Sequence, residues 1–138
     1  MLIYYLKNSF DNIIVTMVPD KNPFKTERSF EQRCSETKAI LPKYPTKCPV
    51  VVQRYYKETN IDAIDQNKFL VPIDMTVHGL MYIIRKRLNI QNESIAMYLF
   101  TEKGNLFATN SNISYVYDKF KDEDGYLYLF YNSENTFG

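Results

Sequence analysis

Hydrophobic residues recur at helical spacing along residues 76–88 and 111–121 of the chain. In the first segment they follow an i, i+3, i+4, i+7, i+11 pattern, which predicts an amphipathic helix. Thr76 suits the N-cap position of this helix. Its apolar stripe consists of Val77, Leu80, Met81, Ile84 and Leu88. The stripe of the second segment consists of Ile113, Val116, Tyr117 and Phe120. Each helix is therefore expected to cover an apolar surface with one face.

A third helix is predicted over residues 29–43. Ser29 can act as its N-cap, and Gln32 three residues later can complete a capping box. Pro42 is expected to end the helix. Ile40 lies beside the stripe that is expected to face inward. That stripe consists of Phe30, Cys34, Thr37 and Leu41.

Four stretches rich in β-branched and aromatic residues predict strands. They are residues 48–56, 69–72, 95–100 and 126–132. The short second stretch ends in Pro72, which lacks a backbone donor and therefore suits the edge of a sheet. The polar residues between the first two strands are expected to form a connection.

The order of these elements predicts the fold class. It runs helix, strand, strand, helix, strand, helix, strand, which is typical of the α+β ubiquitin-like β-grasp, a four-stranded mixed sheet with a crossover helix. Ahead of it, residues 9–18 combine helical spacing with a β-prone Ile-Ile-Val-Thr run, so a helix and a strand are both compatible with this segment. The fold class that we predict includes an N-terminal helical extension.

Length and charge narrow the classes of function. The chain of 138 residues is long enough for one domain, and its formal net charge of +1 gives no reason to expect a nucleic acid partner. Charge is nevertheless uneven. Residues 25–57 contain eight Lys and Arg against three Glu, whereas residues 118–124 contain four acids and two lysines. These segments are either solvated faces or regions that steer a partner.

No motif predicts catalysis, a cofactor or a metal site. His78 is the one histidine of the chain, and the spacing of Cys34 and Cys48 fits neither a metal site nor a disulfide framework. The two thiols are expected to be small buried groups in a reducing, cytosolic compartment. The four glycines are scattered, so no phosphate-binding loop is expected. No apolar run approaches the roughly 18 residues of a membrane span.

Several short motifs nevertheless resemble those of one family. In order along residues 24–138 they are SFEQR, KYP, PVVV, KFLVP, IIRKRL, KDEDGYLYLFY and a final FG. The set is similar to the autophagy ubiquitin-like modifiers, the relatives of microtubule-associated-protein light chain and of the GABA-receptor-associated protein. The resemblance implies a non-enzymatic modifier in autophagosome formation, joined through Gly138 to phosphatidylethanolamine. It also implies activating and conjugating enzymes and a processing and deconjugating protease as partners.

The same resemblance implies a docking site for receptors and adaptors with aromatic-x-x-aliphatic motifs, which would add a strand beside residues 68–72. Its aromatic pocket would consist of Glu36, Ile40, Pro49, Val51, Lys68, Leu70 and Tyr126. Its aliphatic pocket would consist of Phe69, Val71, Pro72, Met75, Leu80, Ile83 and Arg87. Arg28 and Lys47 would form a basic rim. From the residues alone, core positions are an equally good interpretation of most of these side chains.

Three positions depart from the family pattern and bear on partner preference. Glu27 stands where light-chain relatives are basic, Gln66 stands where lysine is common, and Tyr126 replaces the usual phenylalanine. The first two changes weaken the attraction for acidic residues flanking a motif. The third adds a hydroxyl group to the aromatic pocket.

The domain boundaries follow from the same comparison. Residues 1–23 are expected to be an N-terminal extension, of which residues 1–16 are expected to be dispensable for folding, since Met17 begins a stretch similar to a family amino terminus. Residues 24–138 would form the modifier domain, with a tail over 132–138. The protein is expected in the cytoplasm and, when lipidated, on autophagosomal or vacuolar membranes. The alternative is a soluble adaptor for trafficking or cytoskeletal proteins that is not conjugated.

Overall fold

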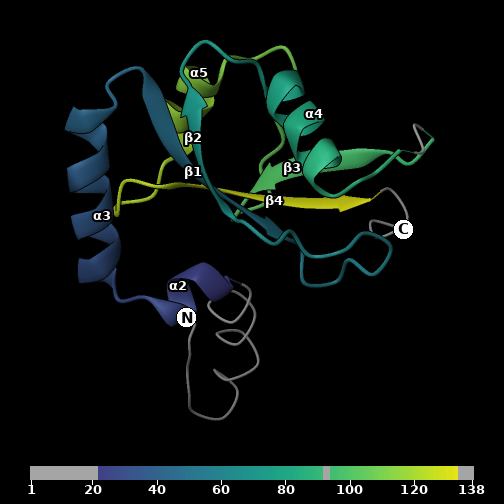
Figure 1. Cartoon of the computed structure of the whole chain (residues 1–138), viewed down its shortest axis with the longest axis horizontal. Coiled ribbons are helices and arrows are strands. Elements are labelled where there is room, and N and C mark those ends of the chain that lie inside the picture. Colours follow the sequence, from purple (N-terminus) through teal and green to yellow (C-terminus); the bar gives the residue numbers. More distant parts are fainter. Residues whose placement is uncertain (1–21, 92–93, 134–138) are drawn as a thin grey trace.

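The computed structural model describes residues 22–91 and 94–133 of the chain. The described helices are α2 (Pro23–Glu27), α3 (Phe30–Lys43), α4 (Val77–Arg87) and α5 (Ile113–Phe120) (Figure 1). The strands are β1 (Lys47–Arg54), β2 (Lys68–Pro72), β3 (Met97–Thr101) and β4 (Leu127–Ser133). The predicted order from the first long helix onward is confirmed, and the short helix α2 precedes it. Residues 9–18 lie outside the described residues.

The four strands form one mixed sheet in the order β2-β1-β4-β3. β1 runs antiparallel to β2 and parallel to β4, and β3 runs antiparallel to β4. The two central strands are the most completely buried, as expected for strands that are covered on both faces. β2 and β3 are therefore the two edges, and the predicted sheet of the β-grasp is confirmed.

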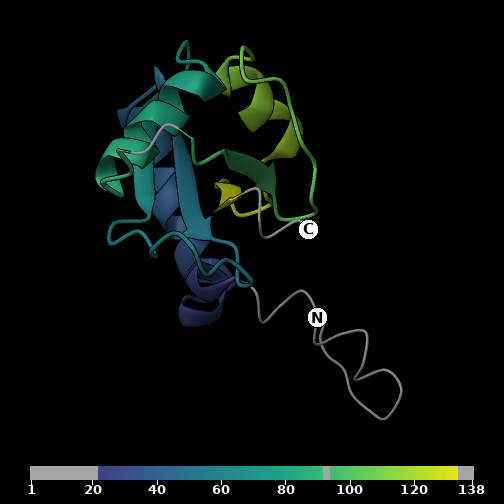
Figure 2. The ribbon, with the colours of Figure 1, turned by 90° about the vertical axis from the view of Figure 1, so that its right-hand side faces the viewer.

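Helices cover both faces of this sheet (Figures 1 and 2). α4 and α5 lie on one face, and α2 and α3 lie on the other. The core under α4 and α5 includes Val50, Val52, Leu80, Ile84, Leu127 and Leu129. A smaller and mostly aromatic core on the other face consists of Phe24, Val51, Phe100, Tyr126, Tyr128 and Phe130. Successive residues of β1 and β4 thus alternate between two cores, because side chains of a strand point to opposite faces in turn.

The stripes predicted for α4 and α5 are confirmed, but the stripe predicted for α3 is only partly correct. Thr37 is buried as expected, but Phe30 and Leu41 are 45% and 37% exposed, and Arg33, which was not predicted, is buried beside Thr37. The surface under this helix carries Asp124, which needs hydrogen-bond donors. Arg33 Nη1 donates to its carboxylate at 2.5 Å, and Thr37 Oγ1 donates to its carbonyl at 2.5 Å. Pairing of a buried carboxylate therefore outweighs the apolar periodicity of the helix.

Two predicted boundaries also shift. Pro42 lies inside α3 rather than ending it, and the helix closes where the Tyr44 N–H donates to the Ile40 carbonyl at 2.9 Å. At the other end of the chain, Asn132 belongs to β4, as the predicted strand over 126–132 implied, and Ser133, which was expected in the tail, belongs to β4 as well.

α2 is fixed to the sheet by polar contacts that begin at Asn22, which is 1% exposed. Its side-chain oxygen accepts from Gln53 Nε2 on β1 at 2.8 Å, and its nitrogen donates to Glu102 at 3.0 Å. The ammonium group of Lys25 bridges Glu102 at 2.8 Å and Asp122 at 2.7 Å. Two acids of residues 118–124 are therefore engaged in contacts within the domain: Asp122 binds Lys25 of α2, and Asp124 binds Arg33 of α3.

Candidate functional site

One side of β2 is open in the part of the chain that the structure describes, because β2 ends the sheet. The other side pairs with β1, and the hydrogen bonds at its two ends define the pattern. The Val52 N–H donates to the Asn67 carbonyl at 2.8 Å, and the Ile73 N–H donates to the Thr46 carbonyl at 3.0 Å. In an antiparallel pair, bonded and non-bonded positions alternate along the strand. The positions between these two ends can therefore be assigned.

The alternation directs the backbone groups of Phe69 and Val71 toward β1 and those of Lys68 and Leu70 toward the open side. Pro72 follows and has no N–H to offer. β2 therefore presents the N–H and C=O groups of two residues to an incoming strand, which is the requirement for strand addition.

Side chains of β2 alternate between the two faces of the sheet. Leu70 lies opposite Pro49 and Lys68 opposite Val51, on the face that carries the aromatic core. Phe69 packs against the core under α4 on the other face. The two predicted pockets therefore lie on opposite faces of one edge strand.

Tyr126 and Glu36, both predicted for the aromatic pocket, are in direct contact. The Tyr126 hydroxyl donates to Glu36 Oε1 at 2.5 Å. Burial raises the pKa of Tyr126, and the hydrogen bond to Glu36 raises it further. The phenol therefore stays protonated and continues to donate to the carboxylate. The sequence identified both residues but did not predict that they would bond to each other.

The other residues predicted for the aromatic pocket differ in exposure. Val51 is completely buried and Pro49 is also buried, so their contribution is limited to packing beneath the surface. Ile40 is half-buried, and Leu70 is 37% exposed. Lys68 is exposed beside them. Leu70, Ile40 and Lys68 are thus the side chains that a ligand could contact directly.

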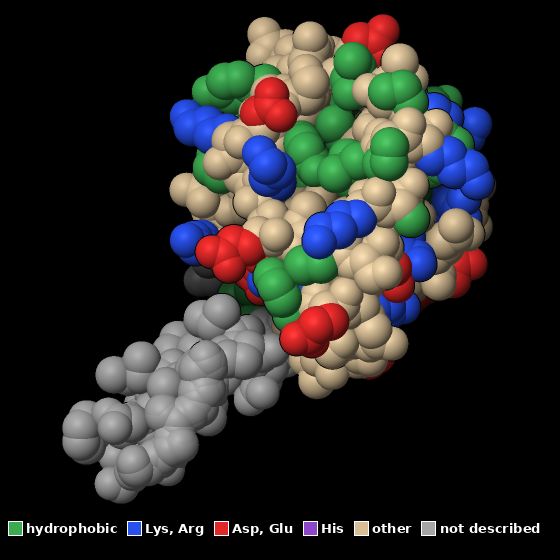
Figure 3. All heavy atoms as spheres, turned by 90° about the vertical axis from the view of Figure 1, so that its left-hand side faces the viewer, with side chains coloured by type: hydrophobic (Ala, Val, Ile, Leu, Met, Phe, Trp, Pro, Cys, Tyr) green, Lys and Arg blue, Asp and Glu red, His purple; other side chains and the backbone are tan. Residues whose placement is uncertain are grey.

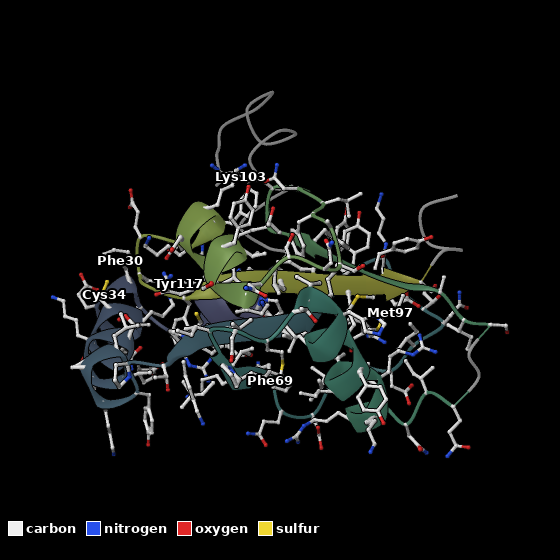
Figure 4. The ribbon with its side chains drawn as sticks, turned by 90° about the horizontal axis from the view of Figure 1, so that it is seen from above. Phe30, Cys34, Phe69, Met97, Lys103 and Tyr117 are labelled. Atoms are coloured by element: carbon white, nitrogen blue, oxygen red, sulfur yellow. The ribbon has the colours of Figure 1, made fainter. Side chains whose placement is uncertain are left out.

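The residues predicted for the aliphatic pocket divide in the same way. Val71 and Leu80 are 2% and 0% exposed and belong to the core. The guanidinium carbon of Arg87 lies 5.7 Å from the centroid of the Phe69 ring, which joins the end of α4 to β2. Figure 4 labels Phe69 at this edge of the sheet, away from Phe30 on α3. The predicted residues that reach the surface are Phe69, Pro72, Met75, Ile83 and Arg87.

Only part of the predicted basic rim is freely exposed. Lys47 is exposed on β1, but the guanidinium of Arg28 stacks on the Phe24 ring at 3.9 Å and lies 3.7 Å from the Glu27 carboxylate. Glu27 therefore offsets part of the charge of Arg28. The face that carries α3 shows hydrophobic side chains in a band between Lys and Arg side chains (Figure 3).

Sequence reasoning missed the polar cluster that holds α3 on the sheet beneath this site. Tyr128 donates through its hydroxyl to Asp124 Oδ2 at 2.5 Å, beside the Arg33 guanidinium. Burial and the hydrogen bond to Asp124 raise the pKa of Tyr128. The one signal in the sequence is the DEDG stretch at residues 122–125, whose composition favours a turn but does not reveal a partner on α3.

The thiol of Cys48 and the imidazole of His78 lie in different surroundings. Cys48 is 4% exposed, and burial together with the charge of Asp118 raises its pKa to about 11, so the thiol is protonated at neutral pH. His78 is exposed. Within residues 22–91 and 94–133, no group of three or more His, Cys, Asp or Glu could hold a metal ion. No helix in these ranges is long and apolar enough to cross a membrane.

The sheet order and the helices on its two faces define a ubiquitin-like α+β domain. A family model described as autophagy protein Atg8, ubiquitin like, matches residues 32–138. Autophagy-related protein 8 of Mycosarcoma maydis is 43% identical over 118 residues, which are 86% of this chain and 98% of that protein. Human microtubule-associated protein 1 light chain 3 gamma is 38% identical over 88% of this chain and 82% of its own length.

Solved structures agree with this relationship. The crystal structure of Trypanosoma brucei ATG8 matches with a TM-score of 0.77 and 32% sequence identity, over 85% of this chain and 98% of that chain. The chain therefore belongs to the Atg8 family of ubiquitin-like autophagy modifiers. The resemblance drawn from its motifs is confirmed.

Proposed function

We propose that this modifier is conjugated through the carboxylate of Gly138 to phosphatidylethanolamine. Family membership supports the proposal, as does the succession of a buried strand by the polar residues 134–136 and then Phe137-Gly138. A terminal glycine has no Cβ, so its carboxylate can enter a narrow enzyme cleft. The chain thus acts as a substrate of other enzymes and not as a catalyst.

The chemistry proceeds in three balanced steps. An activating enzyme joins the carboxylate to the AMP part of ATP and releases pyrophosphate. A cysteine thiolate of the enzyme displaces AMP to form a thioester, which passes to a conjugating enzyme by thiol exchange. The amine of phosphatidylethanolamine then attacks the thioester, and the thiolate leaves as the amide forms. The two acyl chains of the lipid are sufficient for stable membrane anchoring, whereas one chain gives only marginal binding.

Deletion of Gly138 tests this function. The shortened chain should fold and bind peptides as the parent does, because the residue follows the last strand, but it should form neither a thioester nor a lipid adduct. Intact mass after incubation with the activating and conjugating enzymes and phosphatidylethanolamine vesicles measures both products. Lipidation of the shortened chain would refute the proposal. A parent chain that binds peptides but is never conjugated would favour the alternative, a soluble adaptor.

We further propose that the open side of β2 binds peptides with an aromatic-x-x-aliphatic motif. The observation that carries this proposal is that Leu70 and Phe69, predicted for different pockets, lie on opposite faces of β2. The backbone groups of Lys68 and Leu70 point to the side of β2 that is open among the described residues. Residues i and i+3 of an extended peptide point to opposite faces. Such a peptide, paired with β2, would direct its aromatic side chain to one pocket and its aliphatic side chain to the other.

Two substitutions in β2 separate packing from charge in this site. Leu70→Ala removes an exposed apolar contact and should weaken peptide binding by about 1–3 kcal/mol, as at an interface hot spot. Lys68→Ala removes an exposed charge and should cost about 0–1 kcal/mol, decreasing at high salt. Peptide affinity at low and high ionic strength measures both effects, with folding checked by circular dichroism. If folded Leu70→Ala binds as well as the parent, the peptide docks elsewhere.

In the cell, the proposed modifier would be cytoplasmic before conjugation and would lie on autophagosomal or vacuolar membranes afterwards. There it would recruit cargo receptors and adaptors through β2, while a protease would process the chain or release it from lipid. The departures at Glu27 and Gln66 bear on partner choice. Neither side chain is positively charged, so neither attracts the acidic flanks of a motif. Glu27 instead lies beside Arg28, and Gln66 accepts a hydrogen bond from Arg87 at 3.5 Å.

A further inference from the structure

The connection between β1 and β2 contains a buried carboxylate, that of Glu58, which is 2% exposed. Its Oε2 accepts from the backbone N–H groups of Asn60 at 2.7 Å and Ile61 at 2.9 Å. Its Oε1 accepts from the backbone N–H of Ser133 at 2.5 Å, and the Ser133 hydroxyl donates to Oε2 at 3.3 Å. One carboxylate thus joins the loop after β1 to the last residue of β4, 75 positions away.

The contact between Glu58 and Ser133 lies where the pairing of β4 with β1 ends. β1 accompanies β4 only as far as Tyr131, whose carbonyl accepts from the Tyr55 N–H at 2.9 Å. Two residues later, the Ser133 N–H points to the same side, where β1 no longer continues. Glu58 supplies the missing acceptor at this point. Hydrogen bonds to an ionised carboxylate are roughly twice as strong as neutral ones, so this contact holds the end of the strand firmly.

We propose that Glu58 is a positioning residue for conjugation, an inference that rests on the proposed function. By holding Ser133, it fixes the point from which residues 134–138 leave the domain. Five residues span at most about 18 Å, so the Gly138 carboxylate must lie within that distance of Ser133. Without Glu58, the end of β4 would be held on the β3 side alone, where Ser133 pairs with Met97. Ser133 would then move more freely, and the Gly138 carboxylate would occupy the correct position in an enzyme cleft less often.

Tyr131 offers a matched control in the same strand and loop. Its hydroxyl donates to the Asp62 carbonyl at 2.6 Å. Tyr131→Phe therefore removes a partly buried hydrogen bond between β4 and this loop but leaves the contact between Glu58 and Ser133 in place. In Glu58→Gln, by contrast, one of the two acceptor oxygens is replaced by an NH2 group, which cannot accept from the backbone N–H groups that it would face. Glu58→Asp keeps the charge but is one methylene too short, and serves as a second variant if Glu58→Gln does not fold.

The first measurement is hydrogen exchange of the Ser133 amide by NMR in the full chain. Glu58→Gln should accelerate this exchange by about tenfold or more, relative to amides in the middle of β4, because the end of the strand opens locally. Tyr131→Phe should leave the Ser133 amide as protected as in the parent. If the Ser133 amide stays protected in the folded Glu58 variants, the proposal is wrong.

The second measurement is thioester formation and transfer to phosphatidylethanolamine vesicles. At a saturating concentration of the activating enzyme, Glu58→Gln should react about fivefold more slowly or worse, since fewer chains hold the carboxylate in place. The half-saturating concentration and the peptide affinity should not change, because the surfaces that bind partners are intact. Tyr131→Phe should react at the parent rate.

The outcomes separate this proposal from the function beneath it. If the parent chain forms no adduct, the proposed conjugation fails, and the role of Glu58 fails with it. If the parent is conjugated and Glu58→Gln reacts equally fast, only the positioning role is overturned. The same holds if Tyr131→Phe slows conjugation as much as Glu58→Gln does, because loss of stability alone would then explain both.

Discussion

At the scale of single residues, the turn before β4 shows how closely α3 fits the sheet. Gly125 has a φ of +96°, and a Cβ built there would lie 2.5 Å from Thr37 Oγ1. Any other residue would therefore meet both an unfavourable backbone conformation and a clash with α3. The same threonine holds the Asp124 carbonyl, so the clash would also disturb the contact between helix and turn.

Gly125→Ala should consequently destabilise the domain more than Gly104→Ala does. Gly104 also has a positive φ of +87°, but no atom lies within 4 Å of the position of its Cβ. The Gly104 variant should lose about 1–2 kcal/mol of unfolding free energy from backbone strain alone. The Gly125 variant should lose on the order of 3 kcal/mol or more, because strain and steric overlap combine. Urea unfolding of both variants measures the difference, and equal losses would contradict this account of the turn.

The residues that the sequence did not reveal are buried polar ones with distant partners. The turn at residues 122–125 could be predicted from its composition, but the pairing of Asp124 with Arg33 joins positions 91 apart. Glu58 lies in a mostly polar stretch, so no local pattern separates this buried carboxylate from the exposed polar residues around it. Hydrophobic periodicity reports which face of an element is apolar. It does not report which polar group will be buried with a partner.

At the scale of elements, the quality of prediction depended on what each helix covers. α4 lies over an aliphatic core, and its stripe, which includes Leu80 and Ile84, could be predicted from spacing alone. α3 lies over Asp124 and the hydroxyl of Tyr126, and there the same reasoning found Thr37 but also placed the exposed Phe30 and Leu41 inward and missed Arg33. Of the candidate site, the edge position of β2 followed from Pro72, whereas the opposite placement of the two pockets required the register between β1 and β2.

The attachment of α2 makes the stability of the domain dependent on pH. Burial alone would raise the pKa of Asp122, but the hydrogen bonds from Lys25 and from the Asp124 N–H, together with the nearby positive charges, outweigh it, so the pKa lies below its ordinary value of 3.8. Burial alone would lower the pKa of Lys25, but Glu102 and Asp122 raise it above 10.5. The carboxylate therefore contributes stability above pH 3.8 that is lost as the pH falls through its folded pKa. The ammonium group contributes stability below pH 10.5 that is lost as the pH rises through its folded pKa.

Asp122→Asn should therefore cost about 1 kcal/mol of unfolding free energy at pH 7, a modest value because both side chains are partly exposed. The difference from the parent should disappear in acid, as the parent carboxylate takes up a proton below pH 3.8. Glu123→Gln, at an exposed neighbouring position, is the control and should change stability little at any pH. A loss for Asp122→Asn that is the same at pH 7 and in acid would mean that charge does not hold α2.

At the scale of the whole molecule, the two proposed functions use different parts of a single sheet. The open side of β2, at one edge of the sheet, faces the proposed peptide partners. The end of β4 lies in the interior of the sheet order and leads to the proposed site of conjugation. β1 lies between β2 and β4. In a lipid-linked chain, the proposed peptide site on β2 would therefore be separated by one strand from β4, which precedes the proposed lipid attachment residue. The two proposed activities can therefore be tested independently in one chain.

The last prediction concerns where the folded domain begins. Among the described residues, contacts with the sheet reach back to Asn22 through Gln53, and Phe24 is fully buried with its ring 5.2 Å from that of Tyr126. A chain that begins at Met17 retains all of these contacts. It should therefore unfold with a free energy within about 1 kcal/mol of the parent, and a loss above about 2 kcal/mol would mean that the removed residues pack into the domain.

A chain that begins at Lys25 provides the matched comparison. It removes Phe24, whose loss from a core is expected to cost about 3–5 kcal/mol, and it also removes the hydrogen bonds of Asn22. Thermal and urea unfolding of the two truncated chains should therefore differ clearly, with only the shorter one strongly destabilised. If both are equally unstable, the essential contacts lie ahead of Met17. If both match the parent, the attachment of α2 contributes little, and the domain begins at α3.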